Sequence, residues 1–554
     1  MDRVAPLSFR RRHTTGIVLF IAALGLVLRA TSLDLVAFGS DEALLAIAGL
    51  QTAALRNLPA YGAPTSFGFH NPALLVYLVA PFFWISKDPR FAMLAFATLG
   101  AAAVVLAAFT ARRLWGNRAA LAVAVLMAFS PDAVEHCRRL WGHDMIVFWS
   151  ALSVYAAVRG VQEERSRWLG LSMVCAAAAQ ACHLSGILLW VPPLGALILF
   201  SPPRRWRALG AGMLALLAIY LPWFLWDAVG NHFAELGIAF ELISGRHAVA
   251  HRPSPVPPFL VWLTILSDGW HNDHLAAEYG RFLSDARWFG VLMALSRFIS
   301  ACALALGAAA LALAALARKP QYRDSAAWSA LILASAVAPP VVFSLLPTVT
   351  VPPYQLPALV PAAMAGGFLL SRRGRRPPPQ ARQRGVLLLI PGMLGRALAL
   401  IALLFIAAFG PFYTLRARRC LANATDRDRM TTTLRAEIGA MDYITRSTGE
   451  RPYAIMQDAR AVRTGIDYWV VYLHFWISGN PEVPLDRSAP TLFAIHDAKT
   501  ILRPEIAEWL DGKSRVAFGT LAVFRFEEKE ARLWRDLVER FSATSPPEAP
   551  ASAE

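Results

Sequence analysis

Long apolar runs, separated by short polar segments, fill the chain from about residue 16 to residue 412. Most of the runs are roughly 16 to 28 residues long, which is the length that a helix needs to cross a bilayer. Backbone polar groups in lipid must be satisfied within the segment, so we expect these runs to be helices. The predicted spans, about eleven in all, are 16–33, 91–111, 119–135, 145–160, 168–183, 186–201, 208–229, 288–316, 325–346, 355–371 and 385–412.

Short basic clusters between the runs indicate the orientation of the chain. Loops rich in Arg and Lys face the cytoplasm under the positive-inside rule, and the clusters lie at 111–118, 159–167, 201–207, 317–323 and 371–384. The first run has the basic flank of a signal peptide but lacks a small-residue cleavage site, so we expect it to remain as a first helix. With eleven or so crossings, the N-terminus is expected to be cytoplasmic and the C-terminus to be on the outer side.

One apolar stretch, 70–85, does not fit the alternation of outward and inward crossings that the basic loops require. It follows a helix that exits the membrane and precedes one that must run inward, and it is too short for a span. We therefore predict a large outer loop, 34–90, with two helices lying along the membrane at about 41–57 and 72–86. A second large outer loop is predicted at 227–286.

The chain changes character after residue 413, where the predicted membrane domain (1–413) ends. Residues 414–542 are much less apolar, and they combine helical spacing at 427–447 and 527–541 with strand-like segments at 453–457, 491–496 and 515–526. This pattern predicts a small α/β domain on the outer side. The tail, 543–554, is expected to be disordered. The predicted fold class is therefore mainly α, a polytopic membrane protein with a small C-terminal α/β domain.

Composition agrees with this architecture. The chain is 56% hydrophobic and only 17% charged, whereas soluble domains are typically about a quarter charged. A net charge of +16 often indicates nucleic-acid binding, but here the basic residues follow the loops, so nucleic acid is rejected as a partner. The five cysteines show no metal-ligand spacing.

Two adjacent acids, Asp41 and Glu42, stand at the start of the first membrane-lying helix. Ser40 is a residue type that caps helices, and acids in the first turn suit the helix dipole. A carboxylate at a membrane face is also suited to general-base catalysis, because partial desolvation raises its pKa. The sequence leaves both interpretations open.

The segment 130–149 concentrates charge at the outer end of a predicted span. Arginines on the outer face run against the positive-inside bias, and Arg138 and Arg139 beside His143 and Asp144 suggest an anion site. A charge-balanced surface turn would look the same.

Other candidate residues lie in the outer loops. His70 precedes a membrane-lying helix and could equally be an ordinary interfacial histidine. His271 and His274 are metal-ligand types that could join Asp144 at a divalent metal, but their spacing matches no strong motif and ordinary loop residues would look the same. There is no phosphate loop or dinucleotide fingerprint, so no nucleotide cofactor is expected.

These motifs, taken in order over residues 16–370, resemble the GT-C class of membrane glycosyltransferases. The likeness is strongest to the branch with the lipid A aminoarabinose transferases and the protein O-mannosyltransferases. The motifs are "SDEALLAIA", "HNPALLVYL", "ARRLWGNRAALAVAVLMAFSP", an Arg five residues before an Asp (Arg139 and Asp144), and "YQLPALVP".

The resemblance implies an inverting transferase that takes a sugar from a polyprenyl phosphate donor and transfers it on the periplasmic face. By motif, Asp41 would be the base that deprotonates the acceptor hydroxyl. Catalytic roles would then fall to Asp41, Glu42 and Asp144, and donor-phosphate contacts to His70, Arg138, Arg139, His143 and Tyr354. A divalent metal would be held by Asp144, His271 and His274. The acceptor would be a lipid, glycan or protein hydroxyl, and the location a bacterial inner membrane.

Two departures from the family's pattern bear on these roles. Many relatives have Arg or His directly before the late Tyr, where this chain has Pro353-Tyr354; relatives of the aminoarabinose type have Lys-Pro-Pro where it has His70-Asn71-Pro72. The rival interpretation is a transporter or lipid flippase, but these usually show inverted repeats and ionisable residues at mid-membrane. We therefore expect Asp41, His70 and Asp144 to converge on one outward-facing cavity.

Overall fold

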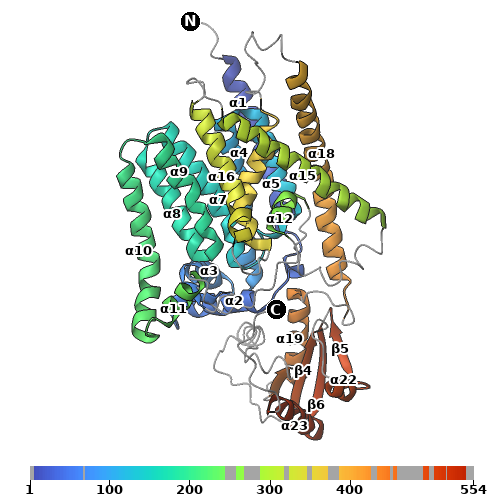
Figure 1. Ribbon diagram of the computed structural model, residues 1–554. Helices are drawn as coiled ribbons and strands as arrows, with labels where there is room; N and C mark the ends of the chain where they lie inside the picture. Colours follow the sequence, from blue (N-terminus) through green and yellow to red (C-terminus); the bar gives the residue numbers. More distant parts are fainter. Residues whose placement is uncertain are drawn as a thin grey trace.

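The chain forms a helical bundle with a small α/β unit at one end (Figure 1). The computed structural model describes residues 5–65, 69–243, 257–267, 287–316, 323–345, 352–371, 386–425, 433–448, 453–457, 491–497, 504–519 and 521–543. Two of the histidines considered above, His271 and His274, lie outside these residues.

In the described part of the chain, 7 helices are long and apolar enough to cross a membrane. They are α1 (Ala5–Ala30), α4 (Pro89–Trp115), α7 (Gly142–Gln162), α10 (Arg205–Gly230), α15 (Arg287–Ala315), α16 (Arg323–Leu345) and α18 (Val386–Ala422).

Shorter helices occupy the remaining predicted spans. They are α5 (Asn117–Phe129), α8 (Ser166–Cys182), α9 (Val191–Phe200), which continues the 3-10 helix η2 (Leu184–Trp190), and α17 (Leu359–Phe368), which continues η4 (Pro352–Ala358). The mainly helical membrane fold is confirmed, whereas the number of crossings stays a prediction.

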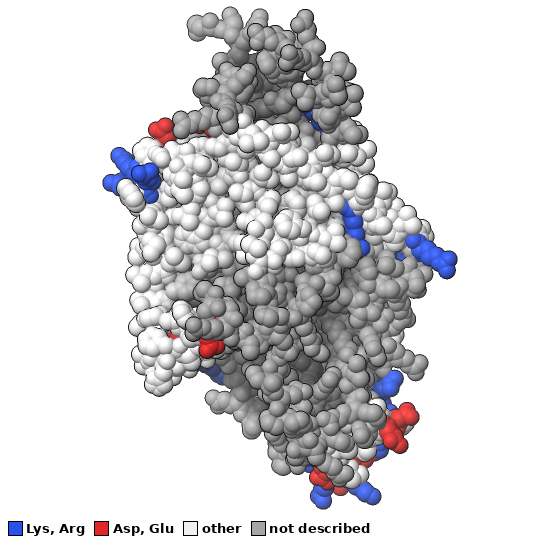
Figure 2. All heavy atoms as spheres, in the orientation of Figure 1, with Lys and Arg blue, Asp and Glu red and all other residues white. Residues whose placement is uncertain are grey.

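Small residues let the helices of the bundle approach closely. Alanine dominates the core that α4, α5, α7 and α17 share, and small side chains are what membrane helices use at their interfaces. The tightest case is α18 against the end of α5, where a Cβ added to Gly410 would lie 1.8 Å from the carbonyl oxygen of Phe129. On the face drawn in Figure 2, the described surface of the bundle is mostly uncharged, with charged groups gathered toward its edges.

The loop 34–90, named the first outer loop after its predicted side, closes one end of the bundle. It contains the 3-10 helix η1 (Leu33–Leu35), the helices α2 (Ser40–Ala53) and α3 (Leu74–Ile85), and a hairpin of β1 (Tyr61–Pro64) and β2 (His70–Pro72). Helices α2 and α3 coincide with the two helices predicted to lie along the membrane. Figure 1 shows them at the end of the bundle away from the N-terminus.

The loop 227–286, named the second outer loop after its predicted side, supplies two more short helices. These are α11 (Ala234–Ile243), which follows α10, and α12 (Pro258–Thr264). A five-residue helix, α6 (Pro131–Glu135), follows α5 and leads into the turn before α7.

The C-terminal unit is a four-stranded sheet with helices. Its elements are α19 (Leu434–Thr448), β3 (Tyr453–Gln457), β4 (Thr491–Asp497), α22 (Pro504–Leu510), β5 (Arg515–Phe518), β6 (Leu521–Glu527) and α23 (Glu528–Ala543). The strand order is β3-β4-β6-β5, with β3 parallel to β4 and the other pairs antiparallel.

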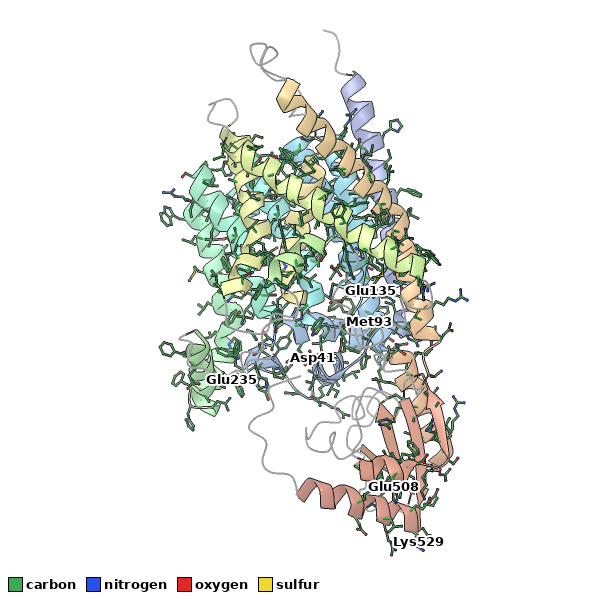
Figure 3. All side chains as sticks on the ribbon, turned by 45° about the vertical axis from the view of Figure 1, so that its right-hand side comes forward. Asp41, Met93, Glu135, Glu235, Glu508 and Lys529 are labelled. Carbon is green, nitrogen blue, oxygen red and sulfur yellow. The ribbon has the colours of Figure 1, made fainter. Side chains whose placement is uncertain are left out.

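This unit packs directly on the first outer loop. Ala37 and Thr433 form an antiparallel bridge, and the N–H of Leu434 donates to the carbonyl of Val36 at 3.2 Å. One hydrophobic core joins α2, α3, α19, β4 and β6. The segment that leads into Asp41 is therefore held between the bundle and the C-terminal unit, as Figure 3 also shows for the labelled Asp41.

Candidate functional site

The two acids at the start of α2 have different surroundings. The N-cap of α2 is Gly39 rather than Ser40, because Ser40 already belongs to the helix. Glu42 is 2% exposed. One oxygen of its carboxylate accepts from the N–H of Gly39 at 3.0 Å, and the other accepts from Nε of Arg139 at 3.0 Å and from its Nη2. Glu42 thus serves to cap the helix and to neutralise a buried arginine.

Asp41, one position earlier in the helix, is exposed. Its Oδ2 accepts from Nε1 of Trp141 at 3.1 Å, and it forms no ion pair with any residue that the structure describes. Partial desolvation by the surrounding protein, followed by the negative charge of Glu42, raises the pKa of Asp41 above its ordinary value. A carboxylate that accepts protons more readily than usual, and that solvent reaches, is suited to act as a base.

Asp41 lines a cavity between the first outer loop and the ends of the bundle helices. Its walls come from α2, the hairpin, α3, the turn before α7, the end of α8 and η4. The lining residues are Asp41, Leu45, Gly62, Ala63, Pro64, Thr65, Asn71, Pro72, Leu75, Val76, Leu140, Trp141, Gly142, His143, Cys182, His183 and Tyr354. The cavity of about 100 Å³ is smaller than most ligand pockets, which measure several hundred Å³, so it suits the reacting end of a substrate.

Aromatic rings gather on one wall of this cavity. The His143 ring lies 3.6 Å from the His183 ring and 3.9 Å from the Trp141 ring, measured between centroids. Tyr354 stacks nearly parallel to His143 at 5.5 Å. The sequence patterns do not single out His183, because it is the last residue of a predicted apolar span. A histidine at the outer end of such a span was the available signal.

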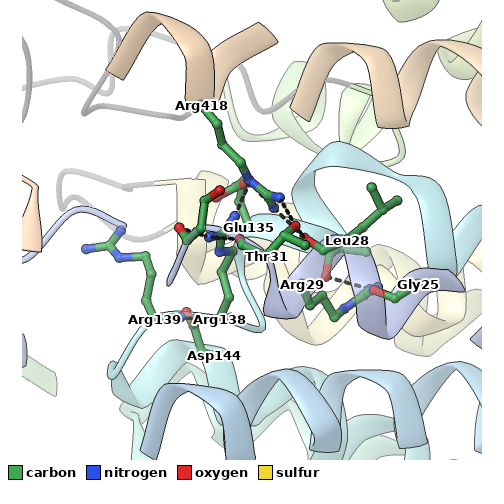
Figure 4. A network of polar contacts seen from close by, with 11 residues as sticks. Gly25, Leu28, Arg29, Thr31, Glu135, Arg138, Arg139, Asp144 and Arg418 are labelled. Carbon is green, nitrogen blue, oxygen red and sulfur yellow. Dashed lines mark hydrogen bonds and ion pairs between the residues drawn. The ribbon is translucent and has the colours of Figure 1, made fainter. Parts of the chain in front are cut away.

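The arginines expected at a phosphate are engaged elsewhere. Arg138 donates from Nη2 to the carbonyls of Thr31 and Ser32 at 2.8 and 2.6 Å, and so binds the end of α1 (Figure 4). Arg139 pairs with Glu42, and its guanidinium lies 4.6 Å from the centre of the Trp141 ring. Neither arginine is among the residues that line the cavity.

Figure 4 shows that this network extends into the bundle. Arg418 of α18 donates to Thr31 Oγ1 at 2.6 Å and lies 3.7 Å from Glu135, while Arg29 donates to Met127 and Ala133 carbonyls at 2.8 Å each. These arginines satisfy carbonyls at helix ends that would otherwise be buried without donors. Their role is to hold α1, α5, α6 and α18 together.

Asp144 holds the turn that carries the cavity's aromatic wall. Its side chain is fully buried, and Oδ2 accepts from the backbone N–H groups of Arg138 and Arg139 at 3.2 and 2.7 Å. Asp144 does not line the cavity. It fixes residues 138–143, and through them the positions of Trp141 and His143.

His70 also lies off the cavity. Its Nδ1 lies 2.8 Å from Oε1 of Glu235, and its backbone N–H donates to the other oxygen of the same carboxylate. Asp227 accepts from the N–H groups of Glu235 and Leu236 at 3.0 Å each, and so caps α11. This pairing ties the second outer loop to the hairpin whose other residues, Asn71 among them, line the cavity.

The described residues give little support to the expected metal site. Within them, no group of three or more His, Cys, Asp or Glu could hold a metal ion. Asp144 is committed to two backbone amides, and His271 and His274 lie outside the described residues. The expected metal set therefore stays a prediction, and the reaction proposed below uses no metal.

Comparison with known proteins agrees with the architecture. The family model for dolichyl-phosphate-mannose-protein mannosyltransferase matches residues 70–226, and a search of the curated proteins finds no match. Among solved structures, ArnT from Cupriavidus metallidurans, bound to undecaprenyl phosphate, has a TM-score of 0.52 at 16% identity, over 92% of this chain and 98% of that chain. An oligosaccharyltransferase from Archaeoglobus fulgidus, tethered to an acceptor peptide, reaches a TM-score of 0.44 at 14% identity, over 84% of this chain and 63% of that one; this weaker likeness carries no argument.

The chain therefore has the GT-C fold of membrane glycosyltransferases and is an integral membrane protein. The match to the mannosyltransferase family model includes β2, α3 and the turn before α7, which form much of the cavity.

Proposed function

We propose that this protein transfers a sugar from a polyprenyl-phosphate-linked donor to an acceptor hydroxyl, with Asp41 as the general base. The observation that carries the proposal is the contrast within the acidic pair. Glu42 is buried and paired, whereas Asp41 is exposed on the cavity, and its second carboxylate oxygen has no hydrogen-bond partner among the described residues and can receive a proton. The fold shared with a protein that binds undecaprenyl phosphate supports the lipid-linked donor.

In the proposed reaction, Asp41 is the base and the polyprenyl phosphate is the leaving group. Asp41 takes the proton of the acceptor hydroxyl, and the hydroxyl oxygen forms a bond to the anomeric carbon of the sugar. The bond from that carbon to the donor phosphate oxygen breaks, and the polyprenyl phosphate leaves with the electron pair. Attack on the face opposite the leaving group inverts the configuration of that carbon, and the proton stays on Asp41 until solvent removes it.

The Trp141 hydrogen bond orients Asp41 for this role. Because Nε1 of Trp141 holds Oδ2, the other carboxylate oxygen is the one presented to the acceptor. Arg139 lies against the Trp141 ring and is itself fixed by Glu42. Glu42 therefore positions Asp41 through Arg139 and Trp141.

A site at the end of the membrane bundle suits a donor of this kind. A lipid-linked sugar keeps its reacting carbon at the membrane surface, and Asp41 lies in a helix at the end of the bundle, close to the C-terminal unit (Figure 3). The basic loops 111–118 and 201–207 favour the cytoplasm for the opposite end. We infer a bacterial inner membrane, a periplasmic active site, and an acceptor that is a lipid, glycan or protein hydroxyl selected with the help of the C-terminal unit.

The proposal is tested by identifying the donor. Lipid-linked sugars from a strain that lacks the gene and from its parent are compared by mass spectrometry, and the purified protein is then supplied with the species that accumulates. Accumulation of one polyprenyl phosphate sugar, consumed by the purified protein with release of polyprenyl phosphate, is the expected result. Unchanged lipid-linked sugars, and no consumption of any donor in vitro, would refute the proposal.

A further inference from the structure

The segment that joins η1 to α2, residues 36–39, lies outside the helices on either side of it. Its backbone is extended at both ends, with φ −70° and ψ 143° at Val36 and φ −125° and ψ −163° at Gly39. Extended backbone outside a helix does not satisfy its own polar groups, so its position depends on the groups that pair with it. Because α2 begins directly after this segment, the segment determines where Asp41, the second residue of the helix, stands.

The C-terminal unit supplies partners for this segment. Thr433 forms the antiparallel bridge with Ala37. The backbone N–H of Leu434, the first residue of α19, donates to the carbonyl oxygen of Val36 at 3.2 Å. The start of α19 thus pairs with the chain only a few residues before the proposed base.

An ion pair extends this contact toward η1. Nε of Arg435 donates to Oδ2 of Asp34 at 2.6 Å. The two side chains are 54% and 23% exposed, respectively. Ion pairs as exposed as this one contribute little to stability. Arg435 can therefore be changed without unfolding the protein, while its effect on the segment is removed.

Apolar packing connects the same segment to the cavity. Val36 and Phe38 are buried in one core with side chains of α19, β4 and β6. That core also contains residues that line the cavity, namely Leu45, Leu75, Val76, Leu140 and Cys182. Because protein interiors are closely packed and transmit strain, a displacement of the C-terminal unit would reach the start of α2 and the cavity wall together.

The side chain of Asp41 has little else to fix it. It is exposed, and among the described residues its carboxylate has one hydrogen bond, from Nε1 of Trp141. Its place in the cavity therefore depends on the backbone at the start of α2. In enzymes, a reacting group misplaced by about 1 Å can slow the reaction by about 10²-fold.

We propose that the C-terminal unit positions the catalytic base, with Thr433, Leu434 and Arg435 as positioning residues that act on Asp41 through residues 34–39. The inference rests on the proposed function, because it needs Asp41 to be the base. It gives the C-terminal unit a part in catalysis itself, in addition to the selection of an acceptor. Contacts at the start of α19 should accordingly affect the turnover rate rather than the affinity for the donor.

A pair of variants at Leu434 of the full-length protein isolates the backbone hydrogen bond. Leu434→Ala and Leu434→Pro both lose the buried side chain, but only Pro lacks the N–H that Val36 accepts. Proline is tolerated at the first position of a helix. We expect Leu434→Pro to have a kcat about tenfold below that of Leu434→Ala, with KM for the donor changed less than about twofold. Hydrogen exchange of the amides of residues 36–45, measured by mass spectrometry, should be faster in Leu434→Pro.

Charge reversal at Arg435 tests the same contact at an exposed position. Arg435→Asp places a second carboxylate against Asp34 and should lower kcat by about threefold or more. The matched control is Arg446→Asp on the same helix, whose ion pair with Asp442 lies within α19, and its kcat should stay within about twofold of the wild type. In an Asp41→Asn background, Arg435→Asp should have no further effect on the residual rate, because it acts through the base.

Equal kcat and equal exchange in Leu434→Pro and Leu434→Ala would overturn the inference. So would an Arg435→Asp variant that matches the wild type, or one that slows the residual reaction of Asp41→Asn as much as it slows the wild type. Should neither Leu434 variant fold, the Arg435→Asp results decide by themselves. Faster exchange of residues 36–45 in Leu434→Pro than in Leu434→Ala, in a protein that transfers no sugar even as the wild type, would refute the proposed function and still support the hold of the C-terminal unit on the segment.

Discussion

Changing one or the other of the adjacent acids should separate stability from activity. Glu42→Gln leaves the side chain nearly the same size and keeps an oxygen that can accept from the N–H of Gly39, but it removes the charge that faces Arg139. Breaking a buried ion pair on one side costs about 3–5 kcal/mol, because the remaining charge is buried without compensation. We expect Glu42→Gln to unfold at a clearly lower temperature than the wild type.

Asp41→Asn is the matched variant one position away. Asp41 is exposed and forms no ion pair with a described residue, so the change in stability should stay within about 0.5 kcal/mol. The raised pKa of Asp41 means that folding favours its protonated form, so the ionised carboxylate at neutral pH slightly destabilises the fold. The neutral amide should therefore be as stable as the wild type at pH 7, or slightly more so.

The assay is thermal unfolding of the purified proteins in one detergent, with binding and transfer measured on the same preparations. The double variant Glu42→Gln/Arg139→Gln completes the cycle, and it should lose less stability than the two single variants added together, because no unpaired charge remains. Wild-type stability of Glu42→Gln would contradict the buried pair. A large loss of stability in Asp41→Asn would contradict the separation of roles.

Further predictions concern the base, the turn and the bundle. Transfer measured as kcat/KM should fall as the pH drops through the raised pKa of Asp41, since the protonated base is inactive, and Asp41→Asn should abolish that acid limb rather than shift it. Asp144→Ala should leave two backbone amides of the turn before α7 without an acceptor. The free energy of unfolding should fall by about 1–3 kcal/mol, measured as lower thermal stability. Asp144→Asn keeps an acceptor oxygen and should lose less stability. Glu235→Gln should loosen α11 from the hairpin, measured as faster limited proteolysis near residue 243 with thermal stability nearly unchanged. Gly410→Ala should displace α18 from the end of α5 and reduce the yield of folded protein, while Gly210→Ala, where an added Cβ meets nothing within 4 Å, should be neutral.

Patterns of apolar residues predicted most of the helices. The long apolar runs were enough to place the helices, including α3, and the parity of the crossings together with the short length of α3 predicts that it does not cross the membrane. Helix formation and span length in a membrane depend on how apolar each segment is, and this can be read from the local sequence.

The partners of the polar residues could not be read from the sequence. Arg139 meets Glu42 from 97 positions away, and Arg138 meets Ser32 from 106 positions away. The sequence gives the charge of Arg138 and Arg139 but not the residues that they contact, so a phosphate was the partner expected for them. His183 was missed for the related reason that an apolar run hides a polar residue at its end until the fold brings His143 beside it.

The acidic pair was only partly predictable. Successive residues on a helix point about 100° apart, so Asp41 and Glu42 were bound to have different surroundings. Which of them would do so depended on where Arg139 lies, and the motif order had assigned the base to Asp41. The cavity position of Asp41 and the burial of Glu42 are consistent with that assignment.

The most direct test of the proposed mechanism is the rate of sugar transfer by Asp41→Asn from a polyprenyl phosphate sugar under saturating donor. A general base typically contributes about 10²- to 10⁴-fold to the rate, so we expect kcat to fall by at least two orders of magnitude while undecaprenyl phosphate binding and thermal stability match the wild type. Transfer at an undiminished rate by a stable Asp41→Asn protein would contradict the assignment of Asp41 as the catalytic base.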